Sequence, residues 1–338
     1  MCNSDDNLKY YSAKILQMPY VKNERMHKGA IILSQVDSLV ELFPTIKDKF
    51  YIIERRAWEG INDSKYADIK LVEDLSTWEK TKEMYPKSIL LDIGPADFVD
   101  TKEFYPLIMK KEIDGIQISS WDRFKRPLLF IRGCSLLPKK RFIKFGHFVE
   151  NGNRDELGLV SECLKEAKKI SSNIDFLYSN VVSNEKLPNT KQEINQIINK
   201  CKIGVLTTKV EGINRFKMEC LAANIPVLVP NDCSFPTKKH INSNTGVIFN
   251  PTPEGLSSAI KYALENIKQF SPRSYITRVS GAIISLEKLK VALFELCKRD
   301  SVENNFDNIF WDGRNQSLVW GEKVFSLLNF VLKEINNE

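Results

Sequence analysis

The sequence predicts an α/β fold made of two doubly wound parallel sheets. Short apolar runs rich in branched residues alternate with longer stretches of helical periodicity from about residue 14 onward, which is typical of parallel α/β units. The alternation starts again after a polar stretch near the middle of the chain. The length of 338 residues also exceeds what one hydrophobic core usually holds, so we expect two domains.

The first half of the chain contains several apolar runs of strand length. They are residues 15–16, 50–53, 88–91, 115–118 and 128–131, with helical periodicity at 30–42 and 104–110. The stretch 136–140 contains Pro138 and paired lysines, a composition that favours an exposed crossing between domains. We therefore predict an N-terminal Rossmann-like domain over residues 1–137.

The second half repeats the same alternation. The predicted strands are 141–145, 175–178, 203–206, 226–229 and 246–249, and the predicted helices include 157–170 and 256–266. These elements predict a second Rossmann-like domain over residues 138–315. Apolar residues at helical spacing over 318–335 predict one amphipathic helix in the terminal segment, residues 316–338.

The composition excludes several classes of protein. The longest apolar runs are strand-sized, far below the roughly 20 residues that a membrane-spanning helix needs. The polar, acidic N-terminus does not resemble a secretory signal, so we expect a cytoplasmic protein, and a place at the inner face of the membrane stays open. Seven cysteines without a C-x-x-C pair predict reduced thiols rather than a disulfide framework or a zinc site.

Basic residues gather in one part of a chain whose formal net charge is only +6. Such a run attracts an anionic lipid surface, a phosphorylated acceptor or nucleic acid, although a solvated charged surface is the simpler interpretation. The residues of this basic run are Arg123, Lys125, Arg126, Arg132, Lys139, Lys140, Arg141 and Lys144.

The most informative segment, residues 203–230, has the pattern strand, loop, helix, strand. Gly212 opens a turn, and the helix begins near Asn214. The free amides at a helix start and the positive end of its dipole suit a diphosphate, to which Arg215 and Lys217 add positive charge. Asn224 is suited to the left-handed conformation that ends a helix.

Two glutamates, Glu211 and Glu219, lie in this segment with seven residues between them. The pattern E-G-x6-E-x2-A-x3-P-V over residues 211–227 resembles the E-x7-E signature of retaining glycosyltransferases, in particular the large family 4. Residues 244–260 resemble the G-L-x-x-x-P segment that introduces a helix there, and residues 320–328 resemble its terminal W-x3-V helix. Residues 116–125 resemble its V-S-x3-R segment, so the resemblance covers roughly 115–338.

The resemblance implies the GT-B fold, in which two Rossmann-like domains face a central cleft and the C-terminal helix crosses back to the N-terminal domain. It implies that Glu219 accepts hydrogen bonds from the ribose hydroxyls of a nucleotide, and that Glu211 holds the transferred sugar and is the catalytic residue. The donor-binding positions that it implies next to them are Gly212, Ile213, Asn214 and Arg215, through their backbone amides. It also implies front-face attack that uses no metal and no cofactor, with the leaving phosphate assisting the acceptor.

The chain departs from the family in the basic residues that hold the diphosphate. The family supplies them in a G-R-(x)n-K-G segment after the first strand of the second domain, which we match to residues 145–154. His147 stands where the arginine is usual, and Arg154 is the obvious substitute for the lysine. The family's N-domain histidine and glycine-rich loop have no counterpart in residues 88–97 and 17–29.

We therefore expect a retaining, metal-independent glycosyltransferase of the hexosyltransferase class. Its donor would be a nucleoside-diphosphate sugar, with a UDP-sugar favoured, and its acceptor a glycan or a lipid-linked glycan, with peripheral membrane association left open. Three alternatives remain, and the first is a related GT-B enzyme such as a sugar-nucleotide epimerase. The basic run keeps a DNA-base glycosyltransferase open, and the missing basic pair and histidine keep a catalytically silent nucleotide-binding GT-B subunit open.

Overall fold

The computed structural model describes residues 11–55, 63–147, 158–170, 173–179, 190–311, 313 and 318–336. The chain divides into two compact units. Unit 1 contains Met1–Phe98 and Ala282–Glu338, and unit 2 contains Val99–Gly281. Each unit is built around one sheet with helices packed against it, so the predicted α/β class is confirmed.

The sheet of unit 1 is mostly parallel. Its strand order is β14 (Val319–Trp320), β1 (Ser12–Gln17), β4 (Gly29–Leu33), β5 (Phe50–Glu54), β6 (Ile69–Leu71) and β7 (Ile89–Leu91). Strand β1 is antiparallel to both of its neighbours, while β4 to β7 are parallel and follow chain order. A separate hairpin joins β2 (Tyr20–Lys22) to β3 (Arg25–His27).

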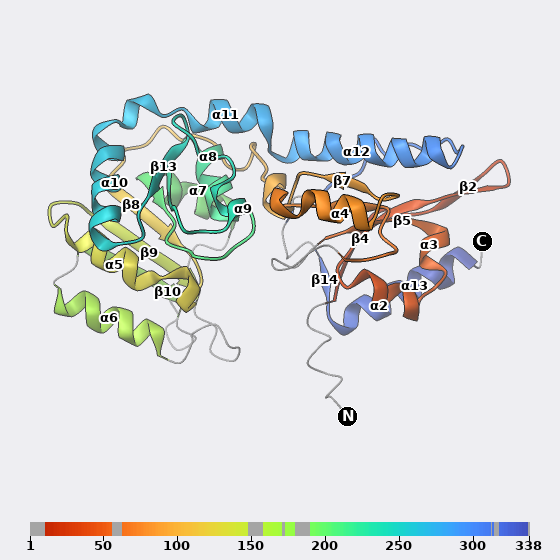
Figure 1. Ribbon diagram of the computed structural model, residues 1–338, viewed down its shortest axis with the longest axis horizontal. Coiled ribbons are helices and arrows are strands. Elements are labelled where there is room, and N and C mark those ends of the chain that lie inside the picture. Colours follow the sequence, from red (N-terminus) through yellow and green to blue (C-terminus); the bar gives the residue numbers. More distant parts are fainter. Residues whose placement is uncertain are drawn as a thin grey trace. The chain divides into compact units, whose positions relative to one another are not determined.

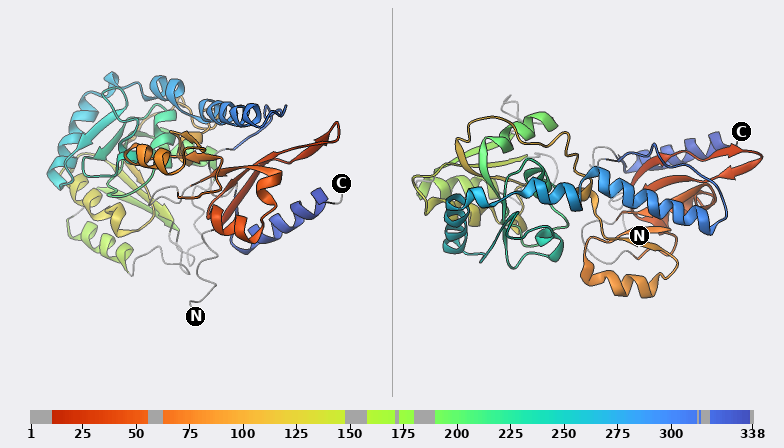
Figure 2. Two further views of the ribbon diagram at one scale, coloured as in Figure 1. Left: turned by 45° about the vertical axis from the view of Figure 1, so that its right-hand side comes forward. Right: turned by 90° about the horizontal axis from the view of Figure 1, so that it is seen from above.

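The two faces of this sheet carry alternate residues of the strands, because side chains of a strand point to opposite faces in turn. Ala30 and Ile32 of β4 pack in one core with α12 (Ala282–Arg299). Ile31 and Leu33 pack in another with α2 (Val36–Leu42) and α13 (Glu322–Asn336). Unit 1 therefore has helix, sheet and helix layers, with α12 and α13 on opposite faces (Figures 1 and 2). The short helices α3 (Ile46–Lys49) and α4 (Trp78–Met84) complete it.

The sheet of unit 2 is parallel throughout. Its strand order is β10 (Ile174–Ser179), β9 (Phe142–His147), β8 (Ile113–Ile118), β11 (Cys201–Val205), β12 (Val227–Pro230) and β13 (Gly246–Phe249). The chain moves outward from β8 to β10 and then returns to place β11 on the other side of β8. This reversal makes a topological switch point between β8 and β11, and ligands of open α/β sheets bind at the carboxyl ends of the strands there.

Helices connect and cover these strands (Figure 1). They are α5 (Pro127–Ser135), α6 (Leu159–Lys169), α7 (Lys191–Asn199), α8 (Arg215–Ala222), α9 (Phe235–Lys238), α10 (Pro253–Glu265) and α11 (Pro272–Val279). Their starts and ends follow local sequence. Thr190 and Glu193 form a capping box at α7, Thr252 caps α10, and Asn224 follows α8 with a φ of 62°, which confirms the left-handed stop expected there.

Four of the expected elements differ from the structure. The expected terminal helix over 318–335 begins only at Glu322, because Val319 and Trp320 form strand β14 against β1. Residues 128–131 lie in helix α5 rather than a strand, because Pro127 begins a helical turn that an apolar run of four residues does not reveal. The expected helix at 30–42 begins with the buried strand β4. Residues 104–110 form no helix. The backbone amides of Tyr105 and Leu107 instead donate hydrogen bonds to the side-chain oxygens of Asn195 and Asn199.

The compact units also begin and end at other residues than expected. The chain leaves unit 1 after Phe98 and returns at Ala282, whereas the expected domain boundaries follow residues 137 and 315. Strand β8 pairs with β9 and β11 and so belongs to the second sheet. The segment 136–140 connects α5 to β9 inside unit 2, because proline and lysine suit any exposed loop and not only a domain crossing.

The structure bears on two further expectations from composition. In the part of the chain that is described, every helix is too short or too polar to cross a bilayer. Among residues 11–336 where the structure describes them, six cysteines are free and buried: Cys134, Cys163, Cys201, Cys220, Cys233 and Cys297.

Candidate functional site

Two loops meet at the switch point of unit 2. The first follows β8 and contains the 3₁₀ turn Arg123–Lys125, and the second follows β11 and leads to α8. The amide of Lys209 donates to the Phe124 carbonyl at 2.8 Å, and the Thr207 hydroxyl donates to the Lys125 carbonyl at 2.6 Å. These bonds fix the two loops to one another at the edge of the sheet where a ligand is expected.

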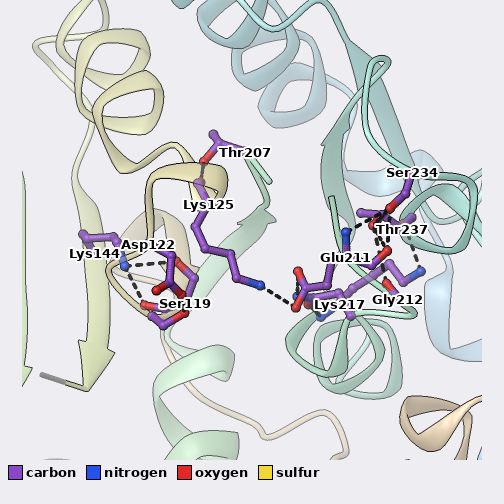
Figure 3. A network of polar contacts seen from close by, with 12 residues as sticks. Ser119, Asp122, Lys125, Lys144, Thr207, Glu211, Gly212, Lys217, Ser234 and Thr237 are labelled. Carbon is purple, nitrogen blue, oxygen red and sulfur yellow. Dashed lines mark hydrogen bonds and ion pairs between the residues drawn. The ribbon is translucent and has the colours of Figure 1, made fainter. Parts of the chain in front are cut away.

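Glu211 lies at the centre of this edge. Its Oε1 atom is 2.6 Å from the ammonium of Lys125 (Figure 3). Its Oε2 atom accepts a hydrogen bond of 2.7 Å from the side-chain amide of Asn214. The side chains of Lys125 and Glu211 are 10% and 21% exposed. The pair is therefore partly shielded from water, yet the carboxylate keeps lone pairs with which to accept further hydrogen bonds.

The main chain at Glu211 is held by side chains from the segment after β12. The Glu211 amide donates to the Ser234 hydroxyl at 3.0 Å, and the Thr237 hydroxyl donates to the Glu211 carbonyl at 3.1 Å. Ser234 also donates to that carbonyl. The position of the carboxylate is thus set by its own backbone as well as by Lys125.

Helix α8 begins directly after this loop. Asn214 caps it, since its Oδ1 atom accepts from the Lys217 amide at 2.8 Å while its amide nitrogen donates to Glu211. Gly212 and Ile213 form the approach to the helix, and Arg215 is its first residue. The start of α8, with its dipole directed at the switch point, is the part of the site suited to an anion.

Glu219 lies one turn further along α8 and is only 6% exposed. It is four residues from Arg215, so both side chains belong to the same face of the helix. Burial raises the pKa of the neighbouring Cys220 thiol, and the charge of Glu219 raises it further. Cys220 is accordingly an unreactive core residue.

Lys217 does not have the role expected of it. Its side chain is fully buried, and its ammonium donates to the carbonyls of Pro236, Thr237 and Lys239 at 3.2, 3.0 and 2.6 Å. Because the Lys217 ammonium donates hydrogen bonds to these three backbone carbonyls, it links α9 to α8 and does not point toward a diphosphate. Helical periodicity alone could not show that the face of α8 carrying Lys217 packs against α9.

Of the two expected diphosphate contacts, the structure describes the position of His147 but not that of Arg154. His147 is the last residue of β9 and so stands at the carboxyl end of the strand next to β8, while Arg154 lies outside the described residues. The segment that we matched to the family's basic pair follows β9, which is the second strand of this sheet in chain order. The first strand in chain order is β8, and the loop after β8 carries Lys125. Lys125 was not expected at the site, because the residues of β8 were assigned to the N-terminal domain.

A buried lysine lies beside the same loop. The ammonium of Lys144 donates to the Ser119 carbonyl at 2.9 Å, to the Ser119 hydroxyl at 3.2 Å and to the Phe145 carbonyl at 3.1 Å (Figure 3). It also lies 4.2 Å from the ring centre of Trp121. Burial lowers the pKa of Lys144 to about 7. This lysine therefore ties the end of β8 to β9 and is sensitive to pH near neutrality.

The described residues contain no group of three or more histidine, cysteine, aspartate or glutamate side chains arranged to hold a metal ion. The titratable groups at the switch point include the pair Lys125 and Glu211 and the buried Lys144.

The fold of the chain has known counterparts among solved structures. No protein-family profile matches the chain, and no curated protein matches it. Its structure is similar to those of GT-B glycosyltransferases, and the chain thus has the GT-B fold.

Three solved structures illustrate this likeness. Sucrose-phosphate synthase from Thermosynechococcus elongatus is 12% identical, with 77% of this chain and 72% of that chain covered and a TM-score of 0.60. HepE of Anabaena in complex with UDP is 10% identical, with 76% of each chain covered and a TM-score of 0.61. The pneumococcal O-GlcNAc transferase GtfA in complex with UDP and GlcNAc is 13% identical, with 77% of this chain and 55% of that chain covered and a TM-score of 0.56.

Proposed function

We propose that this protein is a glycosyltransferase that moves a sugar from a nucleoside-diphosphate sugar, a UDP-sugar by preference, to a glycan or a lipid-linked glycan. The observation that carries the proposal is the Lys125–Glu211 pair at the switch point, next to the start of α8. A cation and a helix start suit a diphosphate, and a carboxylate suits sugar hydroxyls. Support also comes from similar structures that hold UDP or UDP-glucose.

The proposed roles follow from these positions. Lys125 and the amides of residues 212–215 would bind the diphosphate and stabilise the charge that develops on it as the sugar leaves. Glu211 would accept hydrogen bonds from the transferred sugar, and Glu219 from the ribose. We keep His147 and Arg154 as proposed donor contacts. Retention of the anomeric configuration and independence from metal are part of the same proposal, and we assign donor binding to unit 2 and acceptor binding to unit 1.

Lys125 bears on the proposal of a catalytically silent subunit. That alternative arose from the missing basic pair at residues 145–154. Because β8 is the first strand of the unit 2 sheet, the loop after it is the place where the family resemblance implies this pair, and Lys125 lies there 2.6 Å from Glu211. We propose that Lys125 is one of the two cations that bind the diphosphate, and this role favours an active enzyme.

The nucleic-acid alternative loses most of its motivation, because the basic run does not form one free cationic surface. Lys125 and Lys144 are buried. Three exposed arginines of the run form ion pairs with carboxylates. They are Arg123 with Glu162 at 3.5 Å, Arg132 with Glu166 at 2.7 Å and Arg141 with Asp175 at 3.3 Å. A polyanion would have to compete with these carboxylates for the arginines.

The first test is thermal stabilisation by UDP, GDP, ADP and CMP and by their sugars. A ligand that binds only the folded state raises its stability, so the true donor base should raise the melting temperature. Glu219→Ala should abolish the shift and Lys125→Met should reduce it, whereas Asp175→Ala, which removes an exposed carboxylate of unit 2, should retain it. Release of free UDP that requires an acceptor would then support transfer. If no nucleotide shifts the wild-type protein, the proposed donor site is wrong.

A further inference from the structure

The segment after β12, residues 231–238, contacts both loops of the proposed donor site. Asp232 pairs with Arg126, which directly follows Lys125, while Ser234 and Thr237 hold the main chain of Glu211. The two members of the Lys125–Glu211 pair come from different strand ends, β8 and β11, and this third segment reaches both of them.

The contact with Arg126 is a clamp of several hydrogen bonds. Its guanidinium donates to both carboxylate oxygens of Asp232, each at 2.8 Å, and to the carbonyls of Thr207 and Thr208 at 2.5 and 3.1 Å. This bidentate geometry is the strongest form of charged hydrogen bond between side chains. The bonds from Arg126 lower the pKa of Asp232, as expected for a carboxylate that accepts them in its charged form.

The backbone of Arg126 gives an independent reason to regard the clamp as important. Its φ is 50° and its ψ is 53°, the left-handed conformation that residues with a side chain rarely adopt. The Thr207 hydroxyl bonds to the carbonyls of Lys125 and Arg126, at 2.6 and 3.0 Å. An unfavourable conformation persists where its surroundings hold it, and here the contacts of Arg126 and Thr207 do so. The backbone of Lys125 is fixed by the same contacts.

The contact with Glu211 is held just as firmly. Ser234 accepts from the Glu211 amide at 3.0 Å and donates to the Glu211 carbonyl. Below it, the buried ammonium of Lys217 bonds to the carbonyls of Pro236 and Thr237, so α9 is fastened to α8. The segment 231–238 therefore sets the position of the Glu211 carboxylate directly and that of the Lys125 ammonium through Arg126.

We propose that residues 231–238 are the positioning element of the donor site, in which Asp232 acts on Lys125 through Arg126 and Ser234 acts on Glu211 through its main chain. The inference rests on the proposed function, because it assumes that the pair binds a nucleoside-diphosphate sugar. Asp232 and Ser234 are positioning residues and not catalytic ones. They keep the Lys125 ammonium and the Glu211 carboxylate at a fixed separation, so that one can bind the diphosphate and the other the sugar of the same ligand.

A double-mutant cycle tests this proposal, with Asp232→Asn, Lys125→Met and the double variant, and with UDP and inorganic pyrophosphate as probes in calorimetric titrations. Asp232→Asn should weaken both ligands by about tenfold, the size expected when a hydrogen bond to a charged group is impaired. In the Lys125→Met background the same change should have almost no further effect, since Asp232 acts through Lys125. Asp232→Glu should restore most of the affinity.

Asp175→Asn is the matched control, because Asp175 also pairs with an arginine of unit 2, Arg141 at 3.3 Å, on the exposed surface. It should leave both affinities unchanged. Wild-type affinity in Asp232→Asn, or a loss that adds in full to that of Lys125→Met, would overturn the positioning role and leave the proposed function standing. Failure of the wild-type protein to bind UDP or pyrophosphate would overturn the proposed function, and the inference with it.

Discussion

Replacement of Lys144 by methionine tests how the buried lysine couples the switch point to pH. In the folded chain burial lowers the pKa of Lys144 from 10.5 to about 7. The unfolded chain therefore binds one proton more than the folded chain in the interval between these two values. Stability must rise with pH across that interval, because the charged form of Lys144 is disfavoured only in the folded state. Methionine fills a similar volume and has no proton to lose.

The size of the effect follows from the two pKa values. One pKa unit corresponds to about 1.4 kcal/mol, and the folded lysine is half titrated near pH 7. Between about pH 7 and about pH 8.5 the wild-type protein should gain about 1.6 kcal/mol from this group, a gain that Lys144→Met lacks. Buried cysteines such as Cys134 and Cys220, whose pKa values burial raises, oppose the gain at higher pH. They are present in both proteins and cancel in the difference.

Urea unfolding at several pH values in this range measures the prediction. The difference in unfolding free energy between the wild-type protein and Lys144→Met should change steadily with pH, in favour of the wild type as the pH rises. Lys165→Met, which replaces an exposed lysine of α6, is the control and should show a constant difference. A constant difference for Lys144→Met would refute the argument, because it would mean that Lys144 keeps its proton throughout.

Three further predictions concern the site and the fold. Glu211→Gln should bind UDP severalfold more tightly in calorimetric titration, because Lys125 then has no competing carboxylate, while sugar transfer falls; weaker binding of UDP would argue against a diphosphate beside Lys125. Thr190→Ala removes the capping box of α7 and should cost about 1 kcal/mol in urea unfolding. An unchanged midpoint would mean that this cap adds nothing. Gly246→Ala should unfold at a clearly lower temperature, since an added Cβ atom would lie 1.9 Å from the Val227 carbonyl oxygen; a wild-type melting temperature would show that β12 and β13 can separate without cost.

The elements of unit 2 near the E-x7-E segment could be predicted because their sequence signals are local. The strands at 203–206, 226–229 and 246–249 are apolar runs bounded by turn residues, and Asn214 and Asn224 mark the two ends of α8. Strand β4 was hidden in a predicted helix, because all of its residues are buried and its apolar run lacks the alternation of a half-exposed strand.

The parts that could not be predicted depend on contacts between distant residues. The membership of β8 in the second sheet rests on its pairing with β11, some 88 positions later, as in the register of Ile113 with Cys201. Lys125 enters the site through that pairing, and no local pattern marks it. Lys217 was expected at the diphosphate for the same reason, since only the placement of α9 shows that its ammonium is taken by backbone carbonyls.

The division of the chain has a consequence for how it folds during synthesis. Unit 2 is one continuous stretch, Val99–Gly281, whereas unit 1 is completed only by Ala282–Glu338. Leu289 and Leu293 of α12 and Val324 and Leu328 of α13 fill the cores on the two faces of the unit 1 sheet. The sheet strands between residues 12 and 91, which precede unit 2 in the chain, therefore keep apolar faces uncovered until α12 and α13 have been translated. A chaperone that shields nascent chains would act in that interval, because this part of unit 1 can reach its native state only after unit 2 has been translated.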